Sequence, residues 1–275
     1  MVWIMTLALA LSPALAPAAA YPKVGHVVVV IEENHGYSQI LGSDECPYIN
    51  QLAGRGRVLT RSYAVAHPSE PNYLALFAGS TFGVTDDACP PPGAPYDAPD
   101  LASALAAAGA RFTGYSEGLP LTLAAACQDG LVSGYRRKHN SWVDFGGLPP
   151  GANLGFEAFP QDPNALPQVA FVVPNMAHDM HDGTPADADA WLKRSLAPYA
   201  LWCAAHDDLL IVTFDEDNGA EGNHILTLAC GRLVQPGQDD ERVDHYGLLA
   251  TLCRLYGAQA PGQAAQARPL ARLFR

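Results

Sequence analysis

The stretch His26-Val27-Val28-Val29-Val30-Ile31, followed at once by Glu32-Glu33-Asn34-His35, decides the fold of this chain. A short run of β-branched residues like this is typical of a strand that is buried on both faces of a parallel sheet. Two further runs have the same form, Val169–Val173 and Leu209–Phe214. Each run leads directly into polar residues, which predicts three neighbouring strands whose ends carry a polar site.

The polar residues that follow these runs are of types that bind metal ions. The first run ends at Glu33 and Asn34, the third leads into Asp215 and Glu216, and the second precedes the stretch 175–182. In open α/β sheets, ligands bind just beyond the carboxyl ends of the strands. We therefore expect the three clusters to form one composite site with a metal ion. Any one cluster alone would also suit a solvated turn.

Strand-like and helix-like segments alternate along most of the chain. Such alternation is typical of an α/β fold with a mostly parallel central sheet flanked by helices. Residues 145–165, rich in Pro and Gly, are expected to form a long loop. No linker or internal repeat interrupts the pattern, so residues 21–275 are interpreted as a single domain. The expected helices are 47–53, 71–77, 100–108, 187–206 and 245–256, and the expected further strands are 57–65 and 111–115.

The first 20 of the 275 residues form a segment of their own. Residues 1–20 are apolar, carry no charge and end in Ala18-Ala19-Ala20, which favours a secretory signal peptide, although its basic start is missing. A membrane anchor is the alternative, but Pro13 and Pro17 interrupt the segment and argue against a stable span. We therefore expect a secreted or periplasmic protein without a stable membrane anchor.

The charge balance of the chain is acidic, with a net charge of −12 and a pI near 5.0. Binding to nucleic acid needs basic stripes, and the only basic cluster is Arg136-Arg137-Lys138-His139. That cluster suits a single phosphate or carboxylate. No nucleic-acid partner is therefore expected, and the oligomeric state is left open.

The six cysteines form an even set, which in an exported protein predicts up to three disulfides. None belongs to a Cys-x-x-Cys pair, so a zinc–thiolate site is not expected. Cys89 and Cys127 lie in loop-like contexts rich in Pro and Gly and are the first predicted pair. Cys203 and Cys253 lie in helix-like segments, where the alternative is that they are simply buried free thiols.

Ser69 lies in the stretch His67-Pro68-Ser69-Glu70-Pro71-Asn72-Tyr73, where a strand is expected to end and a helix to begin near Pro71. Free N–H groups and the helix dipole favour an anion at such a position. Two interpretations of the serine are open, a helix N-cap and a nucleophile that attacks a bound phosphoryl group. The metal-type clusters favour the nucleophile, because a metal ion lowers the pKa of a hydroxyl and orients the phosphate.

Taken together, six motifs resemble the phosphoesterase family that contains secreted acid phosphatases and phosphatidylcholine-type phospholipases C. That family belongs to the alkaline phosphatase-like superfamily. The motifs follow the family's order over nearly the whole chain after residue 20. They are Glu32-Glu33-Asn34-His35, the stretch 67–80, Arg137-Lys138-His139-Asn140, Pro174-Asn175-Met176 with His181-Asp182, Thr213-Phe214-Asp215-Glu216-Asp217 and Asp244-His245-Tyr246.

The resemblance implies an alkaline phosphatase-like fold, a hydrolase acting on phosphoric esters and a role for each matched position. Ser69 would carry the phosphoryl group as a covalent intermediate, and His245 and His181 would act as catalytic proton donors. The cofactor would be one or two divalent ions of Ca, Mg, Mn or Zn. The implied metal ligands are Glu33, Asn34, Asp215 and Glu216, the implied substrate-binding residues are His67, Asn72, Lys138 and His139, and a possible second metal or its support falls to Asn175, Asp179 and Asp182.

We therefore predict a secreted, metal-dependent phosphomonoesterase of the acid phosphatase type, with a small phosphate ester as substrate. A phospholipase C or other phosphodiesterase on the same scaffold remains the nearest alternative, although the chain leaves little room for a separate lipid-binding domain. A serine hydrolase would need a Gly-x-Ser-x-Gly elbow, and Ser69 lies instead in Pro-Ser-Glu. A non-enzymatic metal-binding module is the third alternative.

Overall fold

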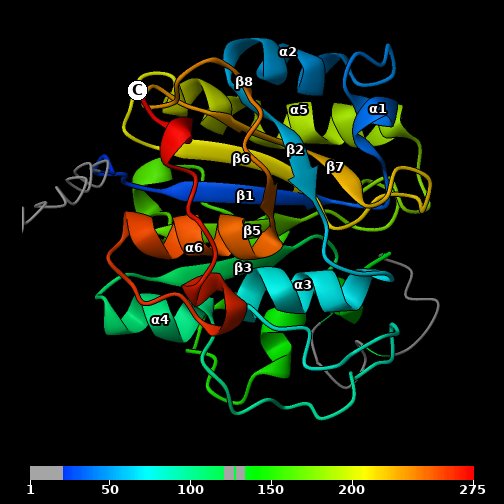
Figure 1. The fold of residues 1–275 in the computed structure, drawn as a ribbon, viewed down its shortest axis with the longest axis vertical. Coiled ribbons are helices and arrows are strands. Elements are labelled where there is room, and N and C mark those ends of the chain that lie inside the picture. Colours follow the sequence, from blue (N-terminus) through cyan, green and yellow to red (C-terminus); the bar gives the residue numbers. More distant parts are fainter. Residues whose placement is uncertain (1–20, 121–126, 128–133) are drawn as a thin grey trace, which may run out of the picture.

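The computed structural model describes residues 21–120, 127 and 134–275 (Figure 1). Their strands form one sheet in the order β4-β3-β5-β1-β6-β7-β2-β8, with β9 paired to β2. The strands are β1 Val27–Glu32, β2 Arg57–Tyr63, β3 Phe112–Ser116, β4 Asn153–Gly155, β5 Val169–Val173, β6 Leu209–Phe214, β7 His224–Cys230, β8 Gly237–Asp239 and β9 Val243–Asp244. The helices are α1 Tyr37–Ile40, α2 Pro47–Arg55, α3 Ser69–Ala78, α4 Leu101–Ala107, α5 Pro185–Cys203 and α6 His245–Leu255.

The three hydrophobic runs are the centre of the sheet. β1 lies between β5 and β6 and runs parallel to both, with Val27 in register with Val169 and Leu209. Every residue of the three strands is buried. Because side chains alternate along a strand, Val27 and Val29 pack toward one helical layer and Val28 and Val30 toward the other. The prediction of three neighbouring strands buried on both faces is confirmed.

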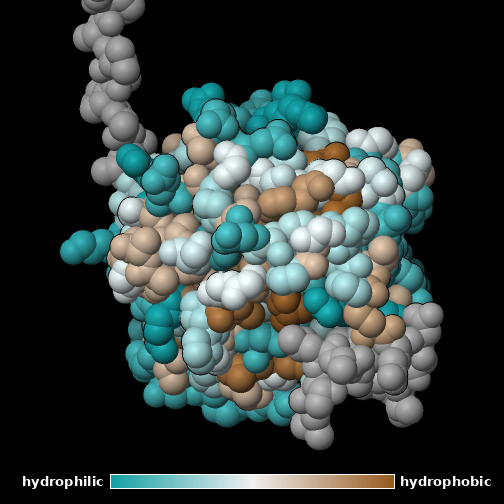
Figure 2. All heavy atoms as spheres, turned by 90° about the horizontal axis from the view of Figure 1, so that it is seen from below, coloured by the Kyte–Doolittle hydropathy of each residue, from teal (hydrophilic) through white to brown (hydrophobic). Residues whose placement is uncertain are grey.

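Helices cover both faces of this sheet (Figure 1). α3, α4 and α6 contribute to the apolar cluster on one face, and α2 and α5 contribute to the cluster on the other. Seen from the α4 side, the surface is largely hydrophilic, with apolar residues gathered in small separate patches (Figure 2).

The sheet is mixed, and the expectation of a mostly parallel sheet was wrong. β7 runs antiparallel to both of its neighbours, β6 and β2. The polar stretch 215–223 joins β6 to β7 without a crossover helix, so the chain returns beside the strand that it has just left. Hydropathy could not reveal this direction, since β7 is as buried as the parallel strands.

All five predicted helices are present, and two of them, α3 and α5, begin two residues earlier than predicted. α3 begins at Ser69 rather than near Pro71, with Pro68 as its N-cap. α6 is capped by the side chain of Asp244, which accepts a hydrogen bond from the backbone N–H of Gly247 at 3.1 Å. The expected loop 145–165 contains the short strand β4. None of the described helices is both long enough and apolar enough to span a bilayer. The predicted signal peptide, residues 1–20, lies outside the described residues.

One disulfide is present, Cys89–Cys127, as predicted. The other four cysteines, Cys46, Cys203, Cys230 and Cys253, are buried free thiols. The upper limit of three disulfides is therefore not reached, and the pairing that occurs is the one in loop-like sequence.

Candidate active site

Ser69 lies where the carboxyl ends of β1 and β6 meet the first turn of α3. Its hydroxyl oxygen Oγ lies 3.1 Å from Glu33 Oε2, 3.3 Å from Glu216 Oε1 and 3.5 Å from Asn34 Oδ1. The side chain makes no capping bond to the helix that Ser69 begins. The N-cap interpretation therefore has no support, and the hydroxyl instead faces three oxygen-bearing side chains.

Asn34 is held in place by its backbone. Its φ of +46° lies in the left-handed region, which Asn tolerates better than most residues. Its N–H donates to Asp215 Oδ1 at 3.1 Å. One end of its amide lies 3.1 Å from both Glu33 Oε2 and Glu216 Oε1. With the nitrogen at that end, the amide donates to both carboxylates. With the oxygen there, it faces the oxygens of Ser69, Glu33 and Glu216, and a cation or a proton among them relieves their repulsion.

A second group of possible metal ligands shares Glu33 with the first. Ligand atoms of Glu33, His139 and Asp179 all lie within 4.8 Å of one another, and all three residues are buried. The two ring nitrogens of His139 lie 3.3 Å from Glu33 Oε1 and 3.4 Å from Asp179 Oδ2. Asp179 Oδ2 and Asp215 Oδ2 are buried and make no hydrogen bond within the described chain, so each has a lone pair to offer to a cation.

Only one of the three residues predicted for a second metal, Asp179, belongs to this group. Asp182 has an exposed carboxylate that contacts His181 Nδ1 at 2.9 Å. Asn175 Oδ1 accepts a hydrogen bond from the Ala177 N–H, and its own N–H donates to Glu117. His139, predicted to bind substrate, lies among the acids instead.

Burial makes these acids hard to ionise. It raises the pKa of Asp215, Glu216 and Asp179 to about 7 in each case, and the charge of Glu216 adds to the effect at Asp215. Burial raises the pKa of Glu33 well above its ordinary value too, with Asp215 and Asp179 adding to the shift. Such a set of acids would repel a phosphate dianion unless cations neutralise it.

Lys138 is the cation that the structure places beside this cluster. Its Nζ donates to Asp87 Oδ2 at 2.8 Å and lies 3.5 Å from His181 Nε2. Burial lowers the pKa of Lys138, but the hydrogen bond to Asp87 and the charge of Glu33 outweigh it and leave the pKa raised. Lys138 is therefore a charged group at the site. His67 lies at the open side, with 45% of its side chain exposed, and contacts Glu216 and Asp217.

Two residues with predicted roles at the substrate, Asn72 and His245, use their side chains on the backbone near the site. Asn72 uses its amide on the backbone, accepting from the N–H groups of Val65 and Ala66 and donating to the carbonyls of Ala66 and Pro68. It therefore supports the loop before Ser69 rather than presenting a donor to substrate.

His245 is buried, and its Nε2–H donates to the backbone carbonyl of Asp215 at 2.6 Å. Burial lowers the pKa of His245, which favours the neutral ring. In this structure the ring therefore contacts the strand end that carries Asp215, and its predicted proton transfer to a leaving group stays a prediction.

Two residues that contact the site were given no role from the sequence. The hydroxyl of Tyr73 donates to Glu33 Oε1, and its ring stacks on His139 with centroids 5.2 Å apart. The signal was available, because Tyr73 lies four residues after Ser69 and so shares its side of a helix. Asp87 had no such signal, since it is one of two neighbouring acids in a loop.

The stretch Gly114-Tyr115-Ser116-Glu117-Gly118 has the spacing of a serine-hydrolase elbow, which was overlooked in the sequence. Ser116 ends β3, is buried, and its Oγ makes no hydrogen bond to any described residue. Glu117 instead accepts hydrogen bonds from His178 and from the Asn175 N–H. Without a base at Ser116, the structure gives no support to a Ser-His-Asp triad there.

Solved structures with a similar arrangement of sheet and helices show the fold of this chain. A protein of the alkaline phosphatase superfamily from Vibrio parahaemolyticus aligns over 94% of this chain and 74% of its own, with a TM-score of 0.63 at 15% identity. A phosphonate monoester hydrolase from Silicibacter pomeroyi aligns over 90% and 76%, with a TM-score of 0.59 at 12% identity. This chain therefore has the alkaline phosphatase-like fold.

The sequence then places the chain in a family. Residues 43–259 match the Phosphoesterase family, and the chain belongs to that family. A phosphatidylinositol-3-phosphatase of Mycobacterium tuberculosis is 45% identical over 92% of this chain and 84% of its own length. An acid phosphatase of Aspergillus fumigatus is 31% identical over 77% of this chain, which spans about half, 51%, of that fungal relative. The predictions of the family and of an enzyme that hydrolyses phosphoric esters are confirmed.

Proposed function

We propose that this protein is a metal-assisted phosphomonoesterase that forms a phosphoserine at Ser69. One observation carries the proposal. The Ser69 hydroxyl is buried at the N-terminus of α3 and faces oxygens of Glu33, Asn34 and Glu216 within 3.5 Å. A helix start attracts the phosphoryl oxygens, and the acid cluster is suited to a cation that activates the nucleophile.

The side chains fit a divalent cation. Glu33, Asn34, Asp215 and Glu216 would hold it through hard oxygen ligands, and Asp215 Oδ2 has no other hydrogen-bond partner in the described chain. When bound, such an ion stabilises negative charge on the phosphoryl oxygens and favours the serine alkoxide. The raised pKa values of these acids support the same conclusion, because the cluster lacks a compensating charge.

In the proposed reaction, different residues of the chain bind the phosphoryl group, attack it and protonate the leaving group. Lys138 and the first turn of α3 bind the phosphoryl oxygens. Ser69 Oγ forms a bond to phosphorus as the bond to the leaving oxygen breaks, and its proton is released to water, because Glu33 and Glu216 would be engaged with the cation. His181, whose Nδ1 faces Asp182, donates a proton to the departing alkoxide. Water then attacks the phosphoserine, which releases inorganic phosphate and restores Ser69.

The relatives support a monoester as the substrate. The mycobacterial relative is named for a 3-phosphate on a phosphatidylinositol, and the fungal relative is named an acid phosphatase. Both names describe removal of a terminal phosphate from an alcohol. We therefore propose this reaction for the chain in place of the phosphodiesterase alternative.

Hydrolysis of p-nitrophenyl phosphate by the purified protein from pH 4 to 9 tests the proposal. We expect chelator to abolish release, and Ser69→Ala to reduce it by at least about 1000-fold. Ser195→Ala is the matched control, because the hydroxyl of Ser195 on α5 makes no hydrogen bond to a described residue. A burst of product and an acid-stable phosphoserine at Ser69 should accompany turnover. Full activity of Ser69→Ala would exclude the nucleophile assignment, and chelator-resistant activity would exclude the metal.

We also infer that the protein works in an oxidising compartment. The Cys89–Cys127 disulfide supports this, because disulfides persist mainly outside the reducing cytoplasm. Fractionation of expressing cells tests it: we expect the active protein in the medium or periplasm with Cys89 resistant to alkylation. Active protein confined to the cytoplasm with a free Cys89 would contradict it.

A further inference from the structure

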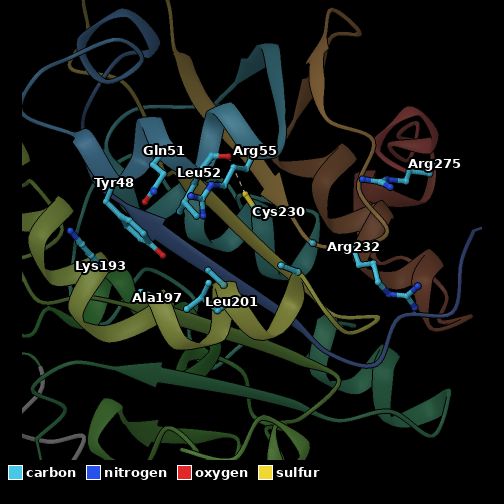
Figure 3. A pocket seen from close by; sticks show the side chains of 13 residues that line it. Tyr48, Gln51, Leu52, Arg55, Lys193, Ala197, Leu201, Cys230, Arg232 and Arg275 are labelled. Carbon is cyan, nitrogen blue, oxygen red and sulfur yellow. Dashed lines mark hydrogen bonds between the residues drawn. The ribbon is translucent and has the colours of Figure 1, made fainter.

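A groove of about 510 Å³ lies between α2 and α5, away from the candidate active site (Figure 3). Its walls are these two helices, and its floor is Cys230 at the end of β7. α2 and α5 pack on the face of the sheet opposite to α3. β7 runs antiparallel to β6, so Cys230 lies at the edge opposite to the one that carries Asp215. A ligand in this groove would therefore not contact Ser69.

The charge of the groove is opposite to that of the whole chain. Arg55, Lys193, Arg232 and Arg275 line it, four of the 16 Lys and Arg residues of a chain with a net charge of −12. None of the described residues that line it is acidic. Arg232 forms an ion pair with Asp207 beside the groove, and Arg275 donates to a backbone carbonyl.

Two of the four cations are available to a ligand. The side chains of Arg55 and Lys193 have neither an ion-pair nor a hydrogen-bond partner in the part of the chain that the structure describes, and both residues are exposed. They stand on opposite walls, Arg55 in the last turn of α2 and Lys193 on α5. Both charges would attract an anion that enters the groove.

The rest of the α5 wall is apolar. Ala197, Ala200, Leu201 and Ala204 line the groove at spacings that place them on one face of the helix. Leu201 is 67% exposed and is the one large hydrophobic side chain that is exposed among the described residues. Small alanine side chains create the space, and Leu201 borders it. Apolar surface of this kind gains from contact with a hydrocarbon chain.

We propose that the groove binds a single-chain anionic amphiphile, a fatty acid, with its carboxylate between Arg55 and Lys193 and its tail along the alanine face of α5. The volume lies within the range of small-molecule pockets, roughly 300–1000 Å³. A simple anion would leave the apolar wall unused, and a neutral lipid would leave the cations unused. A carboxylate also has no phosphoryl group, so this ligand is not a substrate of the proposed reaction.

Titration calorimetry with laurate, below its micelle-forming concentration, tests the proposal on the purified protein. We expect one laurate per chain. Replacing both free cations (Arg55→Gln with Lys193→Gln) should weaken binding at least about tenfold, since each charged contact contributes on the order of a kcal/mol or more. Arg194→Gln is the matched control, because Arg194 is the exposed neighbour of Lys193 on α5 and does not line the groove. It should bind laurate as the unaltered protein does.

Leu201→Glu is a second variant that tests the proposal even if the double variant unfolds. Residue 201 is exposed, so this change should leave the thermal midpoint intact while a negative charge at the groove repels laurate. Dodecyltrimethylammonium, with the same tail and a cationic head, should not bind. The proposal is overturned if laurate does not bind, if the cationic amphiphile binds equally well, or if Leu201→Glu and the double variant bind laurate normally.

Discussion

The candidate active site and the α2/α5 groove are two charged regions that the same sheet separates, and they differ in how their charges are held. At the active site, Glu33, Asp179 and Asp215 are buried together, and their pKa values are raised. In the groove, Arg55 and Lys193 are exposed and unpaired among the described residues. Buried like charges weaken a fold unless something compensates them, whereas exposed cations cost almost nothing. The first region therefore implies a bound cation far more strongly than the second implies an anion.

The largest effect should come from Glu33, which belongs to both ligand groups. Glu33→Gln removes a charge that faces Ser69, Tyr73 and His139, so we expect kcat/KM for p-nitrophenyl phosphate to fall at least about 1000-fold. Glu32→Gln is the matched control. Glu32 is equally buried, and neither of its carboxylate oxygens makes a hydrogen bond in the described chain. It should retain activity within about tenfold. Equal losses of kcat/KM in the two variants would show that activity depends on any buried carboxylate here and not on Glu33 in particular.

The active-site edge was predictable because two simple regularities coincide there. Hydrophobic runs in the sequence identified β1, β5 and β6. The carboxyl ends of neighbouring parallel strands lie at the same edge of a sheet, so the sequence alone could group Glu33, Asn34 and Asp215. The direction of β7 was not predictable, because burial does not encode strand direction. The contact of the buried His245 Nε2 with a backbone carbonyl was not predictable either, because no motif specifies it.

The groove left no signal in the sequence. Its four cations come from α2, α5, the segment after β7 and the last residue of the chain, and each is an ordinary single charge. The alanines of α5 are common helix formers, and their spacing predicts a helix face without indicating what covers it. Only the packing of α2 against α5 brings these residues to one place. A site that only tertiary packing creates can be found in the structure but not in the sequence.

The second effect concerns pH and the free energy of unfolding of the chelated protein. Burial and the charge of Glu216 raise the pKa of Asp215 to about 7, whereas an exposed Asp titrates near pH 4. Between these values the unfolded chain binds fewer protons than the folded one, so stability falls as pH rises and levels off above the folded pKa. The shift sets an upper bound of roughly 4 kcal/mol.

Urea unfolding at pH 5 and pH 8 with chelator measures this loss of stability. Asp215→Asn should show a smaller fall in the urea midpoint than the unaltered protein, because the amide does not ionise. Adding a divalent ion should restore more stability at pH 8 than at pH 5, because protons compete with the metal for the same oxygens. An identical fall in both proteins would place the titrating groups elsewhere.

A third, smaller effect should come from Lys138, the cation of the acid-rich region. Lys138→Gln removes one charged contact to the phosphoryl group, which corresponds to a loss in kcat/KM of about 10–100-fold. Arg136→Gln changes a neighbouring charge of the same basic cluster whose guanidinium donates to the Tyr135 carbonyl. We expect it to alter kcat/KM by less than about threefold, within the range of a surface charge. Steady-state kinetics at low ionic strength would distinguish the two variants. A similar loss of kcat/KM in both would show that the net positive charge of the basic cluster matters, and not a specific contact of Lys138.

The smallest expected effect is a change in KM on substitution of Asp87. Whether KM rises or falls shows how Lys138 is held. Asp87 binds Lys138 Nζ at 2.8 Å, and 28% of its side chain is exposed, so solvent screens the pair. Asp87→Asn keeps an oxygen that can accept the hydrogen bond but removes the charge that neutralises Lys138. The ammonium should then attract phosphate more strongly, and KM should fall about twofold. Asp87→Ala also loses the hydrogen bond, so Lys138 is no longer positioned and KM should rise. If both variants raise KM, the charge of Asp87 itself holds Lys138 toward the substrate. The candidate active site would then depend on a partly exposed ion pair, and it would differ less from the exposed α2/α5 groove than the burial of its acids suggests.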